Sequence, residues 1–451
     1  MLELIIRNGA IGGESGVFTG DVAIADGQIV AVGNEVTGNG QTEIDATGLH
    51  LFPGVIDAHV HFNEPGRAGW EGFVTGTQAL AAGGATVCFD MPLNAHPPTL
   101  DGASFEHKRV ALEGVSWTDI ALWGGLVPGN LDRMEELAAC GVVGFKAFMS
   151  NSGIDDFPAA DDLTLYEGMM RAAELGLIVA VHAESEALTG RLAARAIAAG
   201  KTTARDYLRS RPAIAEIEAI GRALLLAEET GCALHIVHVS TGRGVALVAA
   251  ARARGVDVSC ETCPHYLVLT EDDLETLGAV AKCAPPLRAA AVRDALWSGL
   301  LDGDLSMVAS DHSPAPPDLK SGDDFFRVWG GISGCQSLLP LLLTDGYHRR
   351  HLPLPVIADI TAGYVARRFR LPEKGRLAPG ADADVTLVDL DAGFTLNRDD
   401  LFYRHKHSPY VGRRFRGRVV RTILRGVTTL LDGKIVSPPV GRLIRPVSSP
   451  L

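Results

Sequence analysis

The sequence predicts an α/β protein, a (β/α)8 TIM-like barrel with a small β-sandwich domain formed by both chain ends. Three observations support this prediction. The chain has 451 residues, which is too long for one ordinary domain and fits a barrel plus a smaller domain. Between residues 53 and 370, eight short apolar runs alternate with helical stretches, as in a parallel sheet covered by helices. Residues 1–52 and 371–451 instead show short strands and turns.

Both ends of the chain are predicted to form short strands joined by turns. Strands are predicted at residues 2–6, 21–24 and 29–32, with an Asp26-Gly27 hairpin turn between the last two. The C-terminal part predicts strands at 384–389, 419–424, 428–431 and 434–436. Such small pieces cannot bury a core alone, so we expect the two ends to pair into one domain beside the barrel.

The barrel is predicted from buried strands that alternate with helices. One helix covers residues 214–229, with Ile214, Ile217, Ile220 and Leu224 on one face and Gly231 as its stop. No GxGxxG follows the first strand and no GxxxxGK[ST] loop is present, which argues against dinucleotide binding and phosphoryl transfer. The eight predicted strands cover residues 55–61, 86–91, 120–123, 144–149, 178–182, 234–239, 256–261 and 306–311.

Composition narrows the class of protein. Hydrophobic residues make up 47%, enough for a large core, and the net charge of −13 argues against a nucleic-acid partner. Seven scattered cysteines do not resemble a disulfide framework and favour a reducing, cytoplasmic location. The N-terminus lacks the pattern of a signal peptide, and no apolar run approaches the roughly 20 residues of a membrane span.

Polar residues at the strand ends predict a metal centre. His59 and His61 project from the same face of strand 55–61 and form a pincer for a divalent cation, although two such histidines are often ordinary polar residues. Catalytic residues of a (β/α)8 barrel lie at the carboxyl ends of its strands. Four further side chains occupy such ends, and together the six predict a binuclear site: Lys146, His182, His238 and Asp311.

Each of these residues also has an ordinary structural interpretation. His182 alone fits a satisfied core histidine, and Asp311 fits a cap of the following loop. His238 competes with His235, and the strand end favours His238. Cys260 and Cys263 form a CxxC, but without a second CxxC a zinc or redox role is not favoured.

Lys146 is the residue least suited to an ordinary interpretation. It interrupts an apolar run, and a buried lysine is rarely tolerated without a partner. Burial lowers the pKa of the amine, and a neutral amine can add CO2 to become a carbamate that bridges two metals. Two divalent ions with Asp311, the carbamate and a hydroxide leave a net charge near +1. These are the parts of a hydrolase for an amide-like bond.

The ordered ligand set resembles the metal-dependent cyclic amidohydrolases, a family shared by dihydroorotases, hydantoinases, dihydropyrimidinases and allantoinases. The local sequence is most similar to the allantoinase branch. The resemblance covers nearly the whole chain, and the motifs that carry it are DAHVHFNEPGR at 57–67, MPLN at 91–94, WGGLV at 123–127, GVVGFK at 141–146, ETCPHY at 261–266, AKCAPP at 281–286, SDHSP at 310–314, YRH at 403–405 and SPYVG at 408–412.

This resemblance implies hydrolysis of the hydantoin ring of allantoin to allantoate, with a metal-bridging hydroxide as nucleophile and Asp311 as general base and then acid. It implies two divalent ions, zinc foremost with cobalt, manganese or iron as alternatives, bridged by carboxylated Lys146. It also implies a homotetramer that binds a small molecule. The expected substrate-binding residues are Asn63, Asn94, Ala284, Ser313 and Gly330.

Two positions separate this chain from its relatives. Asn63 stands where dihydroorotases carry an arginine that grips the substrate carboxylate, which favours a substrate without that group. Ala284 stands where some allantoinases carry serine, so a contact there must use the backbone. A hydantoinase or dihydropyrimidinase remains the nearest alternative. A non-catalytic scaffold of the same fold is the alternative from another class.

Overall fold

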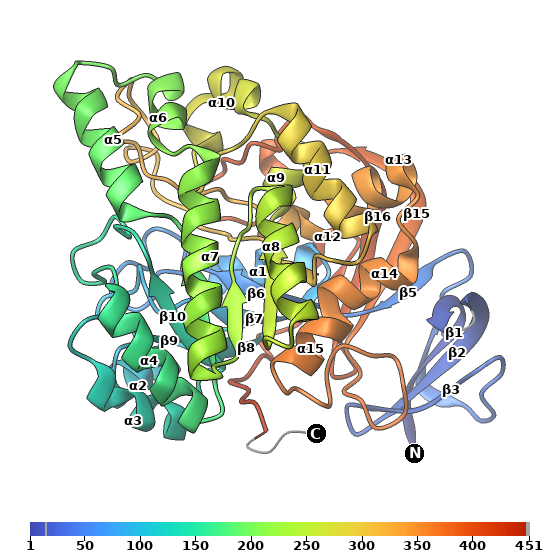
Figure 1. The fold of residues 1–451 in the computed structure, drawn as a ribbon. Coiled ribbons are helices and arrows are strands. Elements are labelled where there is room, and N and C mark those ends of the chain that lie inside the picture. Colours follow the sequence, from blue (N-terminus) through green and yellow to red (C-terminus); the bar gives the residue numbers. More distant parts are fainter. Residues whose placement is uncertain (14–15, 448–451) are drawn as a thin grey trace.

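The computed structural model describes residues 1–13 and 16–447, and its centre is a barrel of parallel strands (Figure 1). Strands β6, β7 and β8 form one sheet, and β14-β13-β12-β11-β10-β9 form another. A bridge between Val60 and His312 brings the two sheets together, which confirms the predicted barrel. The strands are β6 (Val55–Val60), β7 (Ala85–Asp90), β8 (Asp119–Leu122), β9 (Gly124–Gly125), β10 (Gly144–Phe148), β11 (Ile178–His182), β12 (Leu234–Ile236), β13 (Val258–Thr262) and β14 (Met307–Val308).

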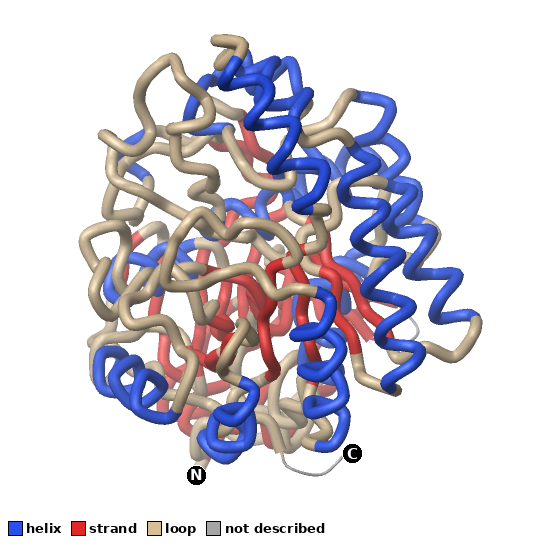
Figure 2. The backbone as a smooth tube through the Cα atoms, turned by 60° about the vertical axis from the view of Figure 1, so that its left-hand side comes forward, coloured by secondary structure: helices blue, strands red, loops and turns tan. Residues whose placement is uncertain are grey.

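Helices cover the outside of the barrel, and Figure 2 shows them in blue around the red strands. The helix predicted at 214–229 is α7, and Gly231 ends it in the left-handed conformation with φ 67°. Within the described residues no helix is long and apolar enough to cross a membrane. The helices are α1 (Phe73–Ala82), α2 (Gly102–Leu112), α3 (Met134–Cys140), α4 (Asp162–Glu174), α5 (Glu186–Ala198), α6 (Ala204–Ser210), α7 (Ala213–Thr230), α8 (Gly242–Ala253), α9 (Pro264–Val268), α10 (Glu271–Leu277), α11 (Ala290–Leu301), α12 (Leu338–Leu341), α13 (His348–Arg350), α14 (Leu354–Ala358) and α15 (Tyr364–Arg368).

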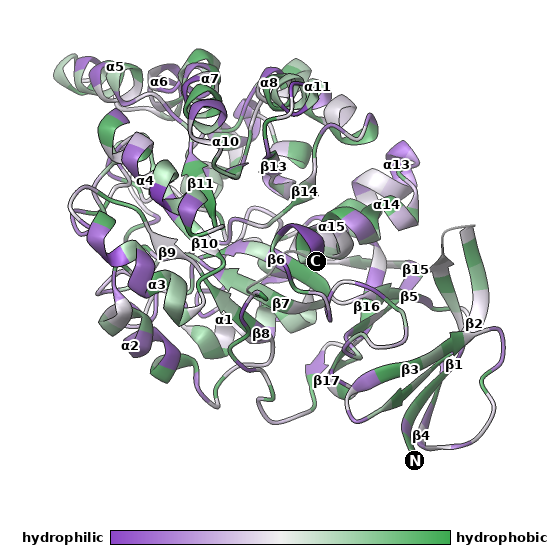
Figure 3. Cartoon of the chain, turned by 60° about the horizontal axis from the view of Figure 1, so that its bottom comes forward, coloured by the Kyte–Doolittle hydropathy of each residue, from purple (hydrophilic) through white to green (hydrophobic). Residues whose placement is uncertain are grey.

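The two chain ends pair in one mixed sheet, seen beside the barrel in Figure 3. Strand β5 joins them, because it lies parallel to β1 and antiparallel to β15. The expected pairing of the ends is therefore confirmed, and the order is β18-β17-β16-β15-β5-β1-β2-β3 with β4 against β1. The strands are β1 (Leu2–Gly13), β2 (Gly16–Ala25), β3 (Gln28–Gly33), β4 (Gly40–Asp45), β5 (His50–Pro53), β15 (Val385–Thr395), β16 (Arg414–Leu424), β17 (Val427–Leu431) and β18 (Lys434–Ile435).

The division into parts at residues 52–53 and 370–371 stays a prediction. Residues 14–15 of the predicted N-terminal part and 448–451 of the predicted C-terminal part lie outside the described residues.

Aromatic side chains fill part of the interior of the barrel. Phe369, just after α15, packs edge-to-face on Phe89 and Trp123, with ring centroids 5.0 and 5.4 Å apart. All three are buried and belong to the apolar cluster that fills the barrel. Since apolar side chains fill the interior, polar chemistry is left to the carboxyl ends of the strands.

Candidate metal centre

The six predicted ligands all lie at the carboxyl end of the barrel, but three of them, His61, His238 and Asp311, lie beyond their strands. His59, Lys146 and His182 belong to β6, β10 and β11. The strands predicted at 234–239 and 306–311 are shorter in the structure, where β12 ends at Ile236 and β14 ends at Val308. His238 and Asp311 have φ of 39° and 45°, a left-handed backbone that departs from the extended conformation of a strand.

One half of the centre combines two histidines with a carboxylate. The Nε2 atoms of His59 and His61 lie 3.2 and 3.4 Å from Oδ1 of Asp311. All three side chains are buried, and their ligand atoms lie within 4.8 Å of one another. Burial alone raises the pKa of Asp311, but the two imidazoles lower it to about 2. The carboxylate is therefore charged and available to a cation.

The other half is built from His182, His238 and Lys146. Nδ1 of His182 lies 3.0 Å from Nε2 of His238. Burial lowers the pKa of both imidazoles, which keeps them in the neutral form that binds metals. Lys146 is fully buried, and its Nζ has no hydrogen-bond partner within the described residues. Burial lowers the pKa of this amine to about 7.

Glu261 orients the histidine on the first strand, and sequence reasoning did not select it. Its Oε1 lies 2.5 Å from Nδ1 of His59, and its Oε2 lies 3.1 Å from Nε2 of His235. This fixes the tautomer of His59 and directs Nε2 at Asp311. It also explains His235, which points to Glu261 while His238 lies in the site. A carboxylate in an otherwise buried strand was the sequence feature that pointed to such a role.

Glu184 has the same role for His182, and sequence reasoning missed it too. Its Oε2 lies 2.9 Å from Nε2 of His182 and also accepts a hydrogen bond from Arg211. Burial opposes the charge on Glu184, but Arg211 and His182 lower its pKa to about 2. Glu184 lies two residues after His182. Nothing in the sequence distinguishes it from a glutamate on the surface.

The residues fit a divalent cation. Nitrogen and carboxylate donors converge from five strands, and two buried polar atoms, Nζ of Lys146 and Nδ1 of His238, lack any partner in the described part of the chain. Buried polar atoms are ordinarily paired, so unpaired ones around one point indicate a missing ligand. Neutral imidazole with carboxylate is a donor set for zinc and its neighbours in the first transition series.

A cavity of about 580 Å³ opens onto this centre. Four of the five predicted substrate-binding residues line it: Asn94, Ala284, Ser313 and Gly330. Asn63 does not line it. It is buried, and both atoms of its side-chain amide lack partners within the described residues. Oδ1 of Asn94 is likewise buried and unpaired, and its Nδ2 lies 3.4 Å from Nδ1 of His61.

Comparison with known proteins agrees with this geometry. Residues 50–436 match the model of the amidohydrolase family. A protein of Rubrobacter xylanophilus named allantoinase is 61% identical over 98% of both chains. One of Solibacter usitatus with the same name is 58% identical over 99% of this chain and 97% of that one.

The solved structures give the same assignment for the fold. The L-hydantoinase (dihydropyrimidinase) from Arthrobacter aurescens has a TM-score of 0.96 and 34% identity, covering 98% of this chain and 99% of that one. A barrel with a divalent metal centre at its strand ends is what this family implies, and the buried histidines and Asp311 stand at that place. The chain belongs to the amidohydrolase family.

Proposed function

We propose that this protein hydrolyses the ring amide of allantoin to allantoate, a step of purine catabolism. The observation that carries the proposal is the 61% identity over 98% of both chains to a protein named allantoinase. The neutral side chain of Asn63 supports it, because an arginine at this place would serve a substrate with a carboxylate. Allantoin has a neutral ureido arm instead.

The proposed cofactor is a pair of divalent ions, zinc foremost, with cobalt, manganese or iron as alternatives. When bound, such a pair lowers the pKa of water toward about 7 and polarises a carbonyl oxygen. The neutral imidazoles and the charged Asp311 suit this role. The ligands are His59, His61, Lys146, His182, His238 and Asp311.

Lys146 is proposed to carry a carboxyl group on Nζ. Its buried amine has no counter-charge in hydrogen-bond reach, and burial lowers its pKa to about 7. A neutral amine attacks the carbon of CO2 and loses one proton, which gives a carbamate anion. The change replaces an unpaired buried amine by an anion that offers two oxygen ligands.

In the proposed reaction Asp311 moves the proton. Its carboxylate takes a proton from the attacking water and delivers it to the ring nitrogen that leaves. Asn94 and Ser313, with the backbone at Ala284 and Gly330, line the cavity and are proposed to hold the ring. Gly331 lets its own backbone lie close to that of Ser313, because a Cβ there would lie 2.2 Å from the carbonyl oxygen of Ser313.

The test is turnover by metal-depleted protein to which zinc, cobalt, manganese and iron are returned one at a time. The substrates are allantoin, hydantoin, dihydrouracil and dihydroorotate, and the protein without added metal is the control. We expect metal-dependent turnover that is fastest on allantoin. Faster turnover of hydantoin or dihydrouracil would assign the hydantoinase activity instead, and no turnover of allantoin with any metal would refute the proposal.

The assembly and location are also proposals. We propose a homotetramer that binds a small molecule and works in the cytoplasm. All seven cysteines are free, which suits a reducing compartment. Light scattering on the purified holoenzyme measures the assembly, and a mass of one or two chains would contradict the tetramer.

A further inference from the structure

Behind Asp311, a thiol and an imidazole converge on its carboxylate. Cys263 follows β13, and His265 lies in α9 two residues later. The Sγ of Cys263, a ring nitrogen of His265 and a carboxylate oxygen of Asp311 lie within 4.8 Å of one another. The relative exposures are 0%, 1% and 8%, so these donors face one another in the protein interior.

The imidazole of His265 has no partner for either polar atom. Both ring nitrogens are buried and lack a hydrogen bond within residues 1–13 and 16–447. A neutral imidazole carries one donor and one acceptor, and burying both without partners is unfavourable. An unpaired imidazole beside a thiol and a carboxylate is therefore a donor set without its ligand.

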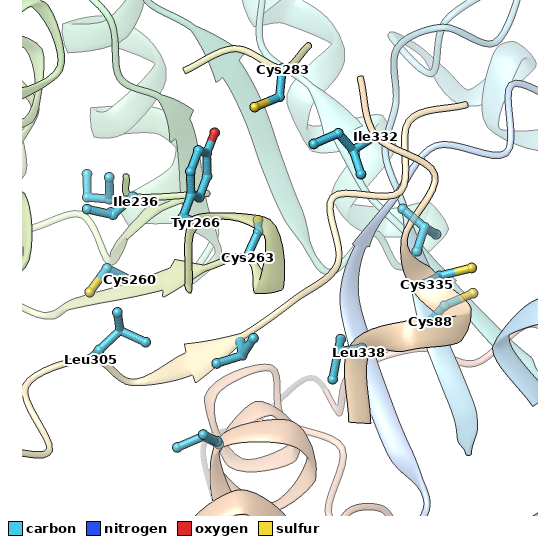
Figure 4. Close-up of a cluster of buried hydrophobic side chains, with 14 of the residues drawn as sticks. Cys88, Ile236, Cys260, Cys263, Tyr266, Cys283, Leu305, Ile332, Cys335 and Leu338 are labelled. Carbon is cyan, nitrogen blue, oxygen red and sulfur yellow. The ribbon is translucent and has the colours of Figure 1, made fainter. Parts of the chain in front are cut away.

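The CxxC motif does not act as a pair. Figure 4 shows Cys260 on β13 among apolar side chains, with its sulfur directed away from that of Cys263. Both are free thiols. The three-residue spacing on a strand and the turn after it places the two sulfurs in different surroundings. Of the two cysteines, Cys263 lies near the carboxylate of Asp311 and Cys260 does not, so the motif supplies one ligand and not two.

We propose that Cys263, His265 and Asp311 bind a thiophilic divalent cation, with Zn²⁺ as the natural ligand. Sulfur, imidazole and carboxylate are all accepted by zinc, at about 2.0–2.3 Å. The three donor atoms already lie within 4.8 Å of one another, so small shifts bring them to these distances from one ion. The thiol releases its proton to water on binding, because the thiolate is the ligand.

This site is separate from the proposed binuclear centre but shares Asp311 with it. Asp311 lines the cavity, whereas Cys263 and His265 do not, so an ion enters past the carboxylate. A carboxylate held by this additional ion cannot accept and return a proton. Excess zinc therefore inhibits the enzyme. The inhibition rests on the proposed function, but occupancy of the site does not.

Cobalt reports occupancy directly. The proposed centre contains only nitrogen and oxygen donors, so Co²⁺ bound there gives no thiolate-to-cobalt band. The holoenzyme is titrated with excess Co²⁺ and its near-ultraviolet absorption recorded. We expect a charge-transfer band that is absent in Cys263→Ser, weakened in His265→Gln and retained in the matched control Cys260→Ser. No band in the native protein, or a band that persists in Cys263→Ser, overturns the site.

Inhibition tests the consequence. Turnover of the holoenzyme is measured while Zn²⁺ is raised beyond the amount that gives full activity. Loss of a metal-site residue weakens binding on the order of tenfold or more, so the inhibitory concentration should rise by that factor in both Cys263→Ser and His265→Gln. Cys260→Ser should match the native protein. Equal sensitivity of all four proteins would show that zinc inhibits elsewhere. His265→Gln decides alone if Cys263→Ser does not fold.

Discussion

At the scale of single residues, Asp311 is the point on which the site depends. Its left-handed backbone turns the carboxylate back over the barrel mouth, where both imidazoles of the first strand face it. A left-handed conformation costs a non-glycine residue on the order of 1 kcal/mol or more. The surrounding contacts maintain it, which is expected where geometry serves chemistry.

Asp311→Asn is predicted to keep metal and lose turnover. The amide retains an oxygen ligand but cannot accept the proton, so kcat should fall by about a hundredfold to ten-thousandfold. Metal content by elemental analysis and kcat on allantoin measure the two effects. Asp323→Asn, at an exposed position, is the control and should keep full activity. Full activity of Asp311→Asn would remove this residue from the proton pathway.

Glu261→Gln is predicted to weaken the metal centre without unfolding the protein. The amide cannot accept from both His59 and His235 as the carboxylate does, so the orientation and basicity of His59 change. Loss of such an outer partner reduces metal affinity by about 10–100-fold. Competition with a chelator measures that affinity, and Glu174→Gln on the outside of α4 is the control. Unchanged affinity would contradict the orienting role of Glu261.

At the scale of elements, the sequence predicted the strands of the barrel and α7, but not β4, β5 or the ends of β12 and β14. Apolar runs identified β6, β10 and β11 because burial on both faces leaves a continuous pattern. The early ends of β12 and β14 were not predicted, because the left-handed conformation of residues such as His238 depends on tertiary contacts. Glu184 was missed for the same reason, since its partner Arg211 is far away in sequence.

Lys374 ties β8 to the segment before β15 at the amino end of the barrel. Its buried Nζ lies 2.7 Å from Asp119 at the start of β8, and 2.8 Å from both Asp382 and Asp384 before β15. Arg425 also bonds to Asp119. The ammonium thus occupies the position that a cation would take among three carboxylates, and it joins the barrel to the sheet of the chain ends.

Lys374→Met is predicted to lower the free energy of unfolding by about 3–5 kcal/mol. The apolar side chain fills the space but leaves buried carboxylates without their main counter-charge. Urea unfolding followed by circular dichroism measures the change. Lys434→Met, at an exposed position of β18, is the control and should lie within about 0.5 kcal/mol of the native protein. A similarly small change in Lys374→Met would mean that Arg425 alone balances the cluster.

At the scale of the whole molecule, the end of the chain is fastened to the barrel opposite the metal centre. The backbone N–H of Ile120 donates to the carbonyl of Arg442, and that of Ile444 donates to Ile120. Gly441 donates to the carbonyl of Ser116. Figure 1 shows this red segment below β8, at the end away from the strand termini that carry the histidines. Nothing in the sequence of the tail predicted this pairing, because it has no strand pattern of its own.

Gly441→Ala tests this attachment. A Cβ at Gly441 would lie 2.0 Å from the carbonyl oxygen of Thr118, so the tail must move away from the barrel. Overpacking of this kind lowers the free energy of unfolding by about 1–3 kcal/mol. Gly33→Ala is the matched control, because a Cβ there meets nothing within 4 Å among the described residues. Thermal unfolding should separate the two variants while kcat stays equal, since the metal centre lies at the other end of the barrel. A fall in kcat for Gly441→Ala at a temperature where it remains folded would show that the two ends of the barrel are coupled.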